Sequence, residues 1–196
     1  MTLAADDPSL ETPRLLLRRM RMEDLDFYTR LHADPEVARY TGPGRPRTPE
    51  ESRALVESTL RFYDELGLGQ LAVVRKSDGE LIGRCGLTYF EIEDLPAGSG
   101  RTPRASYLQG SIPGGIVERE LGYTLARAAW GQGYATEAAG AVFRYTQQKL
   151  HLPRVISIIH PDNAASLNVA RKLGLRLLDQ VRMNDADCGR YLWPVG

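Results

Sequence analysis

The sequence predicts a mixed α+β domain in which helices cover both faces of one sheet. Alternating apolar and polar residues predict seven strands, and apolar residues at helical spacing predict four helices. These elements follow one another as β-α-α-β-β-β-α-β-α-β-β, without regular βαβ repetition, which favours the α+β class. A length of 196 residues suits one core. We expect residues 1–10 to form a flexible tail and residues 11–196 a single domain.

The first third of the chain predicts a strand and two helices. Residues 14–19 alternate as a strand does, and residues 23–33 have the spacing of an amphipathic helix. Residues 41–49 are rich in Gly and Pro and form a loop. Thr48 and Glu51 then have the spacing of a capping box. The second helix therefore begins beside Thr48 and runs to about residue 66, where Gly follows.

A hairpin and a long connection come next. Residues 70–76 and 81–90 alternate as strands, and the Ser-Asp-Gly sequence at 77–79 between them is typical of a tight turn. Residues 91–116 show no periodicity and are rich in Gly, Pro and Ser. A connection of this length exceeds the usual loop in a compact domain, so we expect either a substrate-side lid or a disordered segment.

The last part of the chain alternates strands and helices and ends in two neighbouring strands. The predicted strands are residues 117–125, 154–160, 176–183 and 188–193, and helices start after residues 133 and 163. The final two strands are expected to pair antiparallel and to close the sheet.

Charge and composition exclude several classes of function. Lys plus Arg and Asp plus Glu each number 25, so no global field recruits nucleic acid or an anionic membrane. No apolar run approaches the ~18 residues of a membrane span, and no secretory signal is visible. Two cysteines give no disulfide framework, and Cys85 is expected to be a buried apolar residue. We therefore expect a cytoplasmic protein. The scattered histidines show no metal-ligand spacing, so no metal is expected.

The most informative motif is a glycine-bearing turn between a strand and a helix. Gly131 and Gly133 precede the helix, and Glu137 lies in its first turn. A helix N-terminus presents unpaired amides and a partial positive charge, and glycines let a ligand approach the backbone closely. No Lys follows the glycines, so this is not the phosphate loop of a nucleotide triphosphatase. Glu137 is expected to interact with the helix dipole rather than to act in catalysis.

Together with this motif, three other segments resemble the GNAT acetyltransferase superfamily, and more closely its RimJ/RimL-type branch. The resemblance is carried by residues 130–138, by Pro-Asp-Asn-Ala-Ala-Ser at 161–166, by Glu-Thr-Pro-Arg-Leu-Leu-Leu-Arg at 11–18, and by residues 34–38. It covers about residues 10–195. It implies a mostly antiparallel sheet with a splayed central pair of parallel strands, residues 117–125 and 154–160.

The resemblance also implies that acetyl-CoA is the cosubstrate and lies between these two strands. Backbone groups of Tyr123, Thr124 and Leu125 would pair with the pantetheine arm, and Asn163 would contact the pantetheine or the acetyl end. The diphosphate would bind the backbone amides of Gly131, Gln132, Gly133, Tyr134, Ala135 and Thr136. For the side chains of Trp130 and Tyr134 we expect packing. Asn163 also suits a helix N-cap, and both roles are compatible.

The expected reaction is direct attack of a primary amine on the thioester. Many family members carry a Glu on the strand that corresponds to residues 155–159, where this chain has Ile158. Glu120 is therefore the first candidate for the general base, with Glu118, on the same strand face, and His160 as alternatives, or a water chain.

The candidate acid that protonates the leaving thiolate is Ser166. The Tyr that the family often uses corresponds to Ala170 here, so the usual acid is missing. Ser166 lies on the same helix, although a Ser at this point often only contacts the backbone.

The acceptor is left open between a protein N-terminal α-amino group and a small-molecule amine, including an antibiotic or polyamine. An α-amino group near pKa ~8 is neutral far more often at pH 7 than Lys near ~10.4, which favours α-amino acceptors when no strong base is present. Acidic residues in and beside the 91–116 connection would attract a cationic substrate: Glu91, Glu93, Asp94 and Glu118. A homodimer is also left open.

Two other classes of function remain as alternatives. A catalytically impaired acyl-CoA-binding module would explain the missing Tyr and Glu. A dinucleotide-binding oxidoreductase would explain a Gly-x-Gly turn before a helix, but the third glycine of that fingerprint and repeated βαβ units are missing.

Overall fold

The computed structural model describes residues 9–66, 69–96, 99–107 and 112–193. Most of the predicted tail, residues 1–8, and the Gly67 at which the second helix was expected to stop lie outside these ranges. Leu10, which was assigned to the tail, instead belongs to a short strand, β1 (Leu10–Glu11), that pairs with the next strand.

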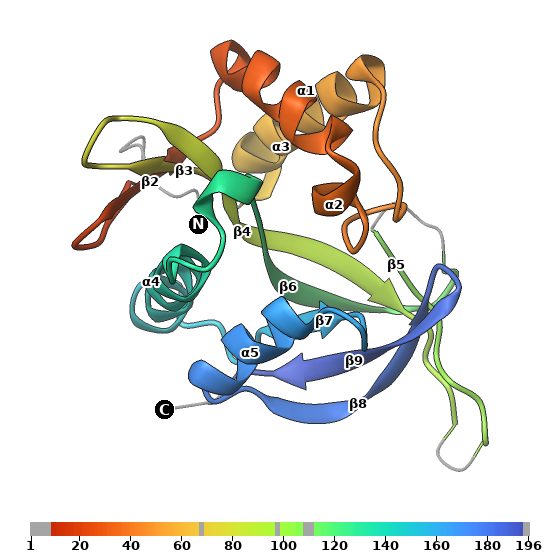
Figure 1. Ribbon diagram of the computed structural model, residues 1–196. Helices are drawn as coiled ribbons and strands as arrows, with labels where there is room; N and C mark the ends of the chain where they lie inside the picture. Colours follow the sequence, from red (N-terminus) through yellow and green to blue (C-terminus); the bar gives the residue numbers. More distant parts are fainter. Residues whose placement is uncertain (1–8, 67–68, 97–98, 108–111, 194–196) are drawn as a thin grey trace. The chain divides into compact units, whose positions relative to one another are not determined.

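The described residues form two compact units, and the first comprises the chain up to residue 87 together with residues 122–145. Its strands are β1, β2 (Leu15–Arg19), β3 (Gln70–Arg75), most of β4 (Leu81–Ile92) and the end of β6 (Ile116–Leu125). Its helical segments are η1 (Met22–Asp24), α1 (Leu25–Ala33), α2 (Pro35–Ala38), α3 (Pro49–Leu66), η2 (Arg127–Ala129) and nearly all of α4 (Tyr134–Gln148) (Figure 1).

The second unit comprises residues 88–121 and the chain from residue 146 onward. It holds the end of β4 and the start of β6, together with β5 (Ala105–Tyr107), β7 (Ile156–Ile159), α5 (Ala164–Lys172), β8 (Arg176–Met183) and β9 (Ala186–Leu192). The two closing strands β8 and β9 pair antiparallel, as the sequence predicted.

Hydrogen bonds link the described strands in the order β1-β2-β3-β4-β6-β7-β9-β8, with β5 beside β4. The pair β6–β7 is parallel, whereas β1–β2, β2–β3, β3–β4, β4–β5, β7–β9 and β8–β9 are antiparallel. This confirms the mixed, mostly antiparallel sheet with one parallel pair. The described sheet has nine strands rather than seven, because β1 and β5 are too short for alternation to show in the sequence.

In the first unit, the structure confirms the predicted capping box before α3 and the predicted turn between β3 and β4. The Glu51 amide donates to Thr48 Oγ1 at 3.2 Å and the Thr48 amide donates to a Glu51 carboxylate oxygen at 2.9 Å, which confirms the capping box at the start of α3. Gly79, in the β3–β4 turn, has a φ of +73°. The short helix α2 was not predicted; the Asp34 side chain caps it by accepting from the Glu36 amide.

The core of the first unit forms where α1 and α3 pack together and β2 and β3 contribute apolar side chains. Leu15, Leu17, Val56 and Val73 are fully buried. Tyr28 of α1 is also fully buried, and its hydroxyl donates to the Gly83 carbonyl of β4 at 3.3 Å. Burial of each such side chain contributes about 1.5–3 kcal/mol, so this core stabilises the packing of α1 and α3 with β2 and β3.

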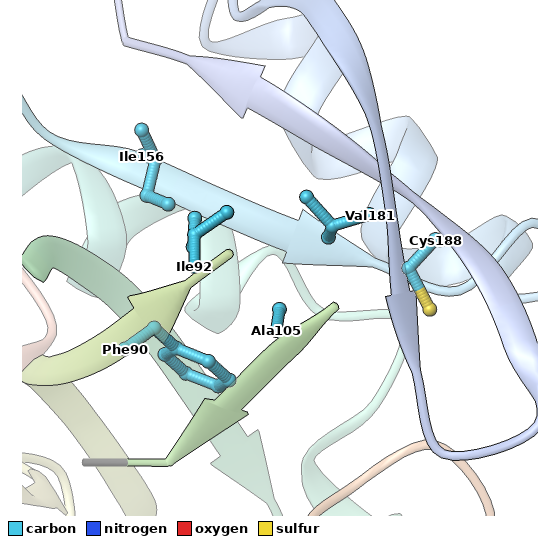
Figure 2. Close-up of a cluster of buried hydrophobic side chains, with 6 residues drawn as sticks. All are labelled: Phe90, Ile92, Ala105, Ile156, Val181 and Cys188. Atoms are coloured by element: carbon cyan, nitrogen blue, oxygen red, sulfur yellow. The ribbon is translucent and has the colours of Figure 1, made fainter. Parts of the chain in front are cut away.

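The core of the second unit draws one or two side chains from each of five strands (Figure 2). Its buried members are Phe90, Ile92, Ala105, Ile156, Val181 and Cys188. Ala105 comes from the 91–116 connection, which therefore contains a strand, β5, and contributes to the core. Residues 97–98 and 108–111 of that connection lie outside the described ranges. Cys85, in the first unit, is buried, as expected, and both cysteines are free thiols.

The strands β4 and β6 approach each other closely at Gly83. A Cβ at this position would lie 2.3 Å from the Thr124 carbonyl oxygen and 2.5 Å from Leu125 Cδ2. Gly83→Ala should therefore destabilise the protein by about 3 kcal/mol or more, because two backbones must separate. Gly79→Ala, where a Cβ meets nothing, should cost only the left-handed backbone strain of about 1 kcal/mol. Urea denaturation measures both, and an equal loss of stability in the two variants would contradict this account.

His32 of α1 is a buried neutral group in the first unit. It is 4% exposed, its Nδ1 lies 3.2 Å from Ser52 Oγ, and its ring stacks against Tyr28. Burial, with smaller contributions from the charges of Arg84 and Arg47, lowers the pKa of His32 to about 3.

Because the pKa of His32 is lower in the folded protein than in the unfolded chain, the free energy of unfolding should depend on pH. The unfolded chain protonates this residue near pH ~6.5, whereas the folded chain keeps it neutral to about pH 3. Between these values the free energy of unfolding should fall as the pH is lowered, by up to about 1.4 kcal/mol per pH unit. His32→Gln should flatten this slope, and His151→Gln, at an exposed position, should not. Denaturation midpoints from pH 3.5 to 6.5 test this; equal slopes in His32→Gln and the parent would refute it.

Candidate active site

The glycine turn of the first unit connects η2 to α4. Gly131 and Gly133 have φ values of +74° and +81°, in the region that favours glycine. The first hydrogen bond of α4 runs from the Glu137 amide to the Gly133 carbonyl at 3.1 Å. Within the described chain, none of the backbone amides of residues 131–136 donates to another protein group. They form a row of donors at a helix N-terminus, which suits an anionic ligand.

The end of β6 leads into this turn. The Ala126 amide donates to the Ile82 carbonyl of β4 at 2.9 Å, and backbone groups alternate in direction along a strand. The backbone groups of Tyr123 and Leu125 therefore point away from β4. Trp130 Nε1 donates to the Leu125 carbonyl at 2.8 Å, so that carbonyl already has one partner.

The two aromatic side chains of the turn differ. Trp130 was expected to pack, but its side chain is 47% exposed and is held by the Leu125 hydrogen bond. Tyr134 is 8% exposed, and Arg14 Cζ lies 4.5 Å from the centroid of its ring. This confirms that the Tyr134 side chain packs. Tyr134 can thus contribute its backbone amide to a ligand, while its side chain supports the turn.

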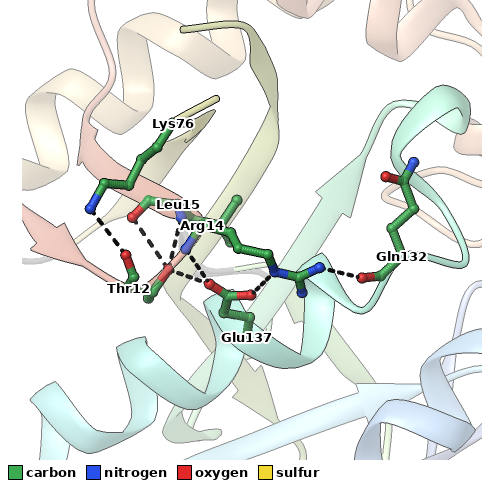
Figure 3. A network of polar contacts seen from close by, with 6 residues as sticks. All are labelled: Thr12, Arg14, Leu15, Lys76, Gln132 and Glu137. Carbon is green, nitrogen blue, oxygen red and sulfur yellow. Dashed lines mark hydrogen bonds and ion pairs between the residues drawn. The ribbon is translucent and has the colours of Figure 1, made fainter. Parts of the chain in front are cut away.

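A polar network joins the first strands to α4 (Figure 3). Glu137 Oε1 accepts from Thr12 Oγ1 at 2.6 Å and from the Arg14 amide at 2.9 Å, and Glu137 Oε2 accepts from Arg14 Nε at 2.6 Å. Arg14 Nη1 also donates to the Gln132 carbonyl at 2.9 Å. Burial acts to raise the pKa of Glu137, but the bonds from Thr12 and Arg14 outweigh it and lower that pKa. Glu137 is therefore ionised, and its carboxylate ties the first turn of α4 to Thr12 and Arg14.

In the second unit, Glu118 is a paired carboxylate. It is 8% exposed and lies 2.9 Å from Arg154 Nη2 and 3.6 Å from Arg190 Nη1. Arg190 Nε also donates to Asp179 at 2.7 Å. Because two guanidinium groups lie within ion-pair distance of this carboxylate, Glu118 is part of a structural ion pair and a weaker candidate base.

Glu120 lies two residues further along β6, in the second unit. It is 8% exposed, and its Cα stands opposite Ile156 in the parallel pairing of β6 with β7. Arg154 and Arg190 pair with Glu118 on the same strand, which leaves Glu118 the weaker of the two candidates. The assignment of Glu120 as the general base stays a prediction from the sequence.

A chain of side-chain hydrogen bonds marks the end of the parallel pair. Ser157 Oγ donates to the Leu121 carbonyl at 2.6 Å, and Trp193 Nε1 donates to Ser157 Oγ at 3.0 Å. Ser157 and Trp193 are 6% and 3% exposed. A hydroxyl therefore satisfies a β6 carbonyl in place of a backbone amide, and the β6–β7 register consists of the single pair of Glu120 and Ile156.

The start of α5 holds two further candidates. Asn163 Oδ1 accepts from the Ser166 amide at 3.0 Å, which makes Asn163 the N-cap. That bond uses only Oδ1, so the two N–H groups on Asn163 Nδ2 take no part in it. Ser166 is partly exposed. Ala170, which stands where members of the family often have a Tyr as the acid, is 3% exposed. His160 Nδ1 accepts from the Asp162 amide at 3.1 Å, which directs the proton of a neutral ring to Nε2.

The acidic residues expected to attract a cationic substrate are partly compensated. Glu93 lies 3.2 Å from Arg101 Nη2 and 3.6 Å from Arg104 Nε. Glu91 accepts from the Ile112 amide at 2.9 Å, and Glu118 is paired as described above. The local field is therefore weaker than the composition of the 91–116 connection suggested.

The predicted residues fall in both units. The first contains Tyr123, Thr124, Leu125 and residues 131–136, on one continuous strand-turn-helix segment. The second contains Glu120, Asn163 and Ser166. Two contacts were not predicted from the sequence. The bond between Arg14 and Glu137 had one signal, the Thr-Pro-Arg motif at 12–14, and the bond between Ser157 and Trp193 had none. The described residues contain no cluster of His, Cys, Asp and Glu suited to a metal, nor a helix able to cross a membrane.

Comparisons with known proteins agree with this geometry. Residues 14–176 match the model of the Acetyltransferase (GNAT) domain. The uncharacterized N-acetyltransferase p20 of Bacillus licheniformis is 27% identical over 188 residues, 94% of this chain and 91% of its own. The FsC-acetyl coenzyme A-N(2)-transacetylase of Aspergillus fumigatus is 31% identical over 176 residues, 89% of this chain and 67% of its own.

Solved structures show the same fold. An acetyltransferase of Agrobacterium tumefaciens, 28% identical, superposes with a TM-score of 0.73 over 100% of this chain and 99% of its own. RimL, a ribosomal L7/L12 α-N-protein acetyltransferase in complex with coenzyme A, is 15% identical and has a TM-score of 0.69 over 94% of this chain and 97% of its own. The chain belongs to the GNAT acetyltransferase family, and it is an acyltransferase whose cosubstrate is acetyl-CoA.

Proposed function

We propose that this enzyme acetylates a primary amine by direct attack of the amine on the thioester of acetyl-CoA. The observation that carries the proposal is the row of unpaired amides from residue 131 to residue 136, at the start of α4 and next to two glycines of positive φ. These donors suit the diphosphate of the cosubstrate. The backbone edge of Tyr123 and Leu125 would pair with the pantetheine arm, and the Asn163 side-chain amide would donate to its acetyl end.

The acceptor that the site favours is an α-amino group, as in the RimJ/RimL-type branch. The Glu and the Tyr that family members often use are replaced here by Ile158 and Ala170. An acceptor of which a useful fraction is already neutral at pH 7 is therefore favoured. Pairing of Glu93 and Glu118 with arginines removes much of the charge that would attract a polyamine. The RimL structure has this fold and bears the name of an α-N-protein acetyltransferase. A protein N-terminus is therefore the first acceptor class, and a small amine of low pKa the second.

Two side chains are assigned to proton transfer. Glu120, on β6, would accept a proton from the acceptor nitrogen, directly or through water, so that the neutral amine attacks the thioester, and Ser166 would donate a proton to the departing thiolate. A CoA thiolate is a tolerable leaving group, so Ser166 is expected to contribute less than Glu120.

The first test is an assay of thiol release with acetyl-CoA against peptides of varied N-terminal residue, polyamines and aminoglycosides. We expect release with peptides that have a free N-terminus, and mass spectrometry should place the acetyl group on the α-nitrogen. N-terminally blocked peptides that contain Lys are the matched control and should not react. Calorimetric binding of CoA without thiol release from any of these amines would instead identify a catalytically impaired acyl-CoA-binding module.

The second test compares Glu120→Gln with Glu118→Gln. Loss of a general base should lower kcat of Glu120→Gln by about 10²–10⁴-fold, while CoA affinity stays unchanged. Glu118→Gln removes a buried ion-pair partner of two arginines and should instead lower the melting temperature. A Glu120→Gln enzyme with the parent kcat would exclude Glu120 as the base and leave the water chain.

A further inference from the structure

The direction of the peptide groups in the glycine turn decides whether its amides can bind an anion. Glycines are free to adopt many conformations, so the two glycines of the turn do not by themselves fix this direction. In a trans peptide, the carbonyl of one residue and the amide of the next point in opposite directions, and the described chain has no cis peptide bond. A donor that holds the Gln132 carbonyl on one side therefore directs the Gly133 amide to the other side.

Arg14 is that donor, and its guanidinium is fixed on several sides. Nη1 donates to the Gln132 carbonyl at 2.9 Å, and Nε donates to Glu137 at 2.6 Å. The guanidinium lies 4.5 Å above the ring of the buried Tyr134. Nη2 lies 3.4 Å from the place that a Cβ on Gly133 would occupy. Figure 3 shows the side chain of Arg14 reaching from the start of β2 to the turn.

Arg14 also changes the electrostatics of the turn. Glu137 carries its carboxylate in the first turn of α4, close to the amides of residues 131–136, where an unpaired negative charge would repel a diphosphate. The Arg14 Nε–Glu137 Oε2 ion pair compensates that charge. One side chain therefore both orients the turn, through Nη1, and removes a repulsion, through Nε.

We propose that Arg14 is a positioning residue for diphosphate recognition: it holds the Gln132 carbonyl so that the following amide faces the cosubstrate, and it neutralises Glu137. This rests on the proposed binding of the acetyl-CoA diphosphate at residues 131–136. Arg14 acts through the turn and through Glu137, and its side-chain partners come from the turn and α4 of the first unit.

The two roles predict effects of opposite sign for the two members of the ion pair. Arg14→Met loosens the turn and leaves Glu137 uncompensated, so the Kd of CoA should rise about ten-fold or more. Glu137→Gln removes the repelling charge and keeps Arg14, so CoA should bind as tightly as to the parent or more tightly. The double variant should lie between Arg14→Met and the parent. Calorimetry with CoA measures all four proteins.

Lys76→Met is the matched control. Lys76 Nζ bonds Glu11 Oε2 at 2.9 Å and the Thr12 carbonyl at 3.2 Å, in the same network but on the side away from the turn. It should lower the melting temperature at most and leave the Kd of CoA unchanged. Melting curves identify any variant that does not fold; Glu137→Gln and Lys76→Met still test the sign of the effect.

Three results would overturn the inference. The first is an Arg14→Met Kd within about two-fold of the parent value. The second is an equal loss of affinity in Arg14→Met and Glu137→Gln, which would show a structural tether only. The third is a loss in Lys76→Met as large as in Arg14→Met. Failure of the parent protein to bind CoA would instead reject the proposed function, so the two failures are distinguishable.

Discussion

The backbone amides at the start of α4 are the constraint on which the candidate site depends. A helix leaves its first amides without internal partners, and a protein can satisfy them with a cap, with water or with a ligand. In this chain, the turn before α4 has glycines rather than a Ser, Thr or Asp cap, and the acidic group of the first turn is directed to Arg14 and Thr12. Within the described residues, the amides thus have no protein partner, while the helix is still anchored to the first strands.

The second unit uses side chains to end a strand pairing. The parallel pair of β6 and β7 needs its carbonyls satisfied where backbone pairing stops, and the Ser157 hydroxyl does this for Leu121. Trp193 supports that hydroxyl from the end of the described chain. The ion pairs of Glu118 with Arg154 and Arg190 hold the preceding residues of β6. These contacts hold the part of β6 that carries Glu120.

Local patterns in the sequence predicted most elements, because caps, turns and periodicity depend on neighbouring residues. The capping box at Thr48, the turn at Gly79 and strand β8 were all correct. Strands β1 and β5 were missed because two or three residues show no periodicity. The Arg14–Glu137 and Ser157–Trp193 contacts join residues that are 123 and 36 positions apart, and one sequence carries no signal for such pairs. The pairing of Glu118 with two arginines was hidden for the same reason.

The burial of both cysteines has a consequence for an enzyme that releases a thiol at each turnover. Cys85 and Cys188 have no exposed surface, and desolvation raises the pKa of the Cys188 thiol. Thiol–disulfide exchange requires an accessible thiolate. The disulfide of oxidised coenzyme in the surrounding solution therefore meets no accessible cysteine thiolate on the folded protein that could attack it, and the enzyme should resist inactivation through mixed disulfides with its own by-product.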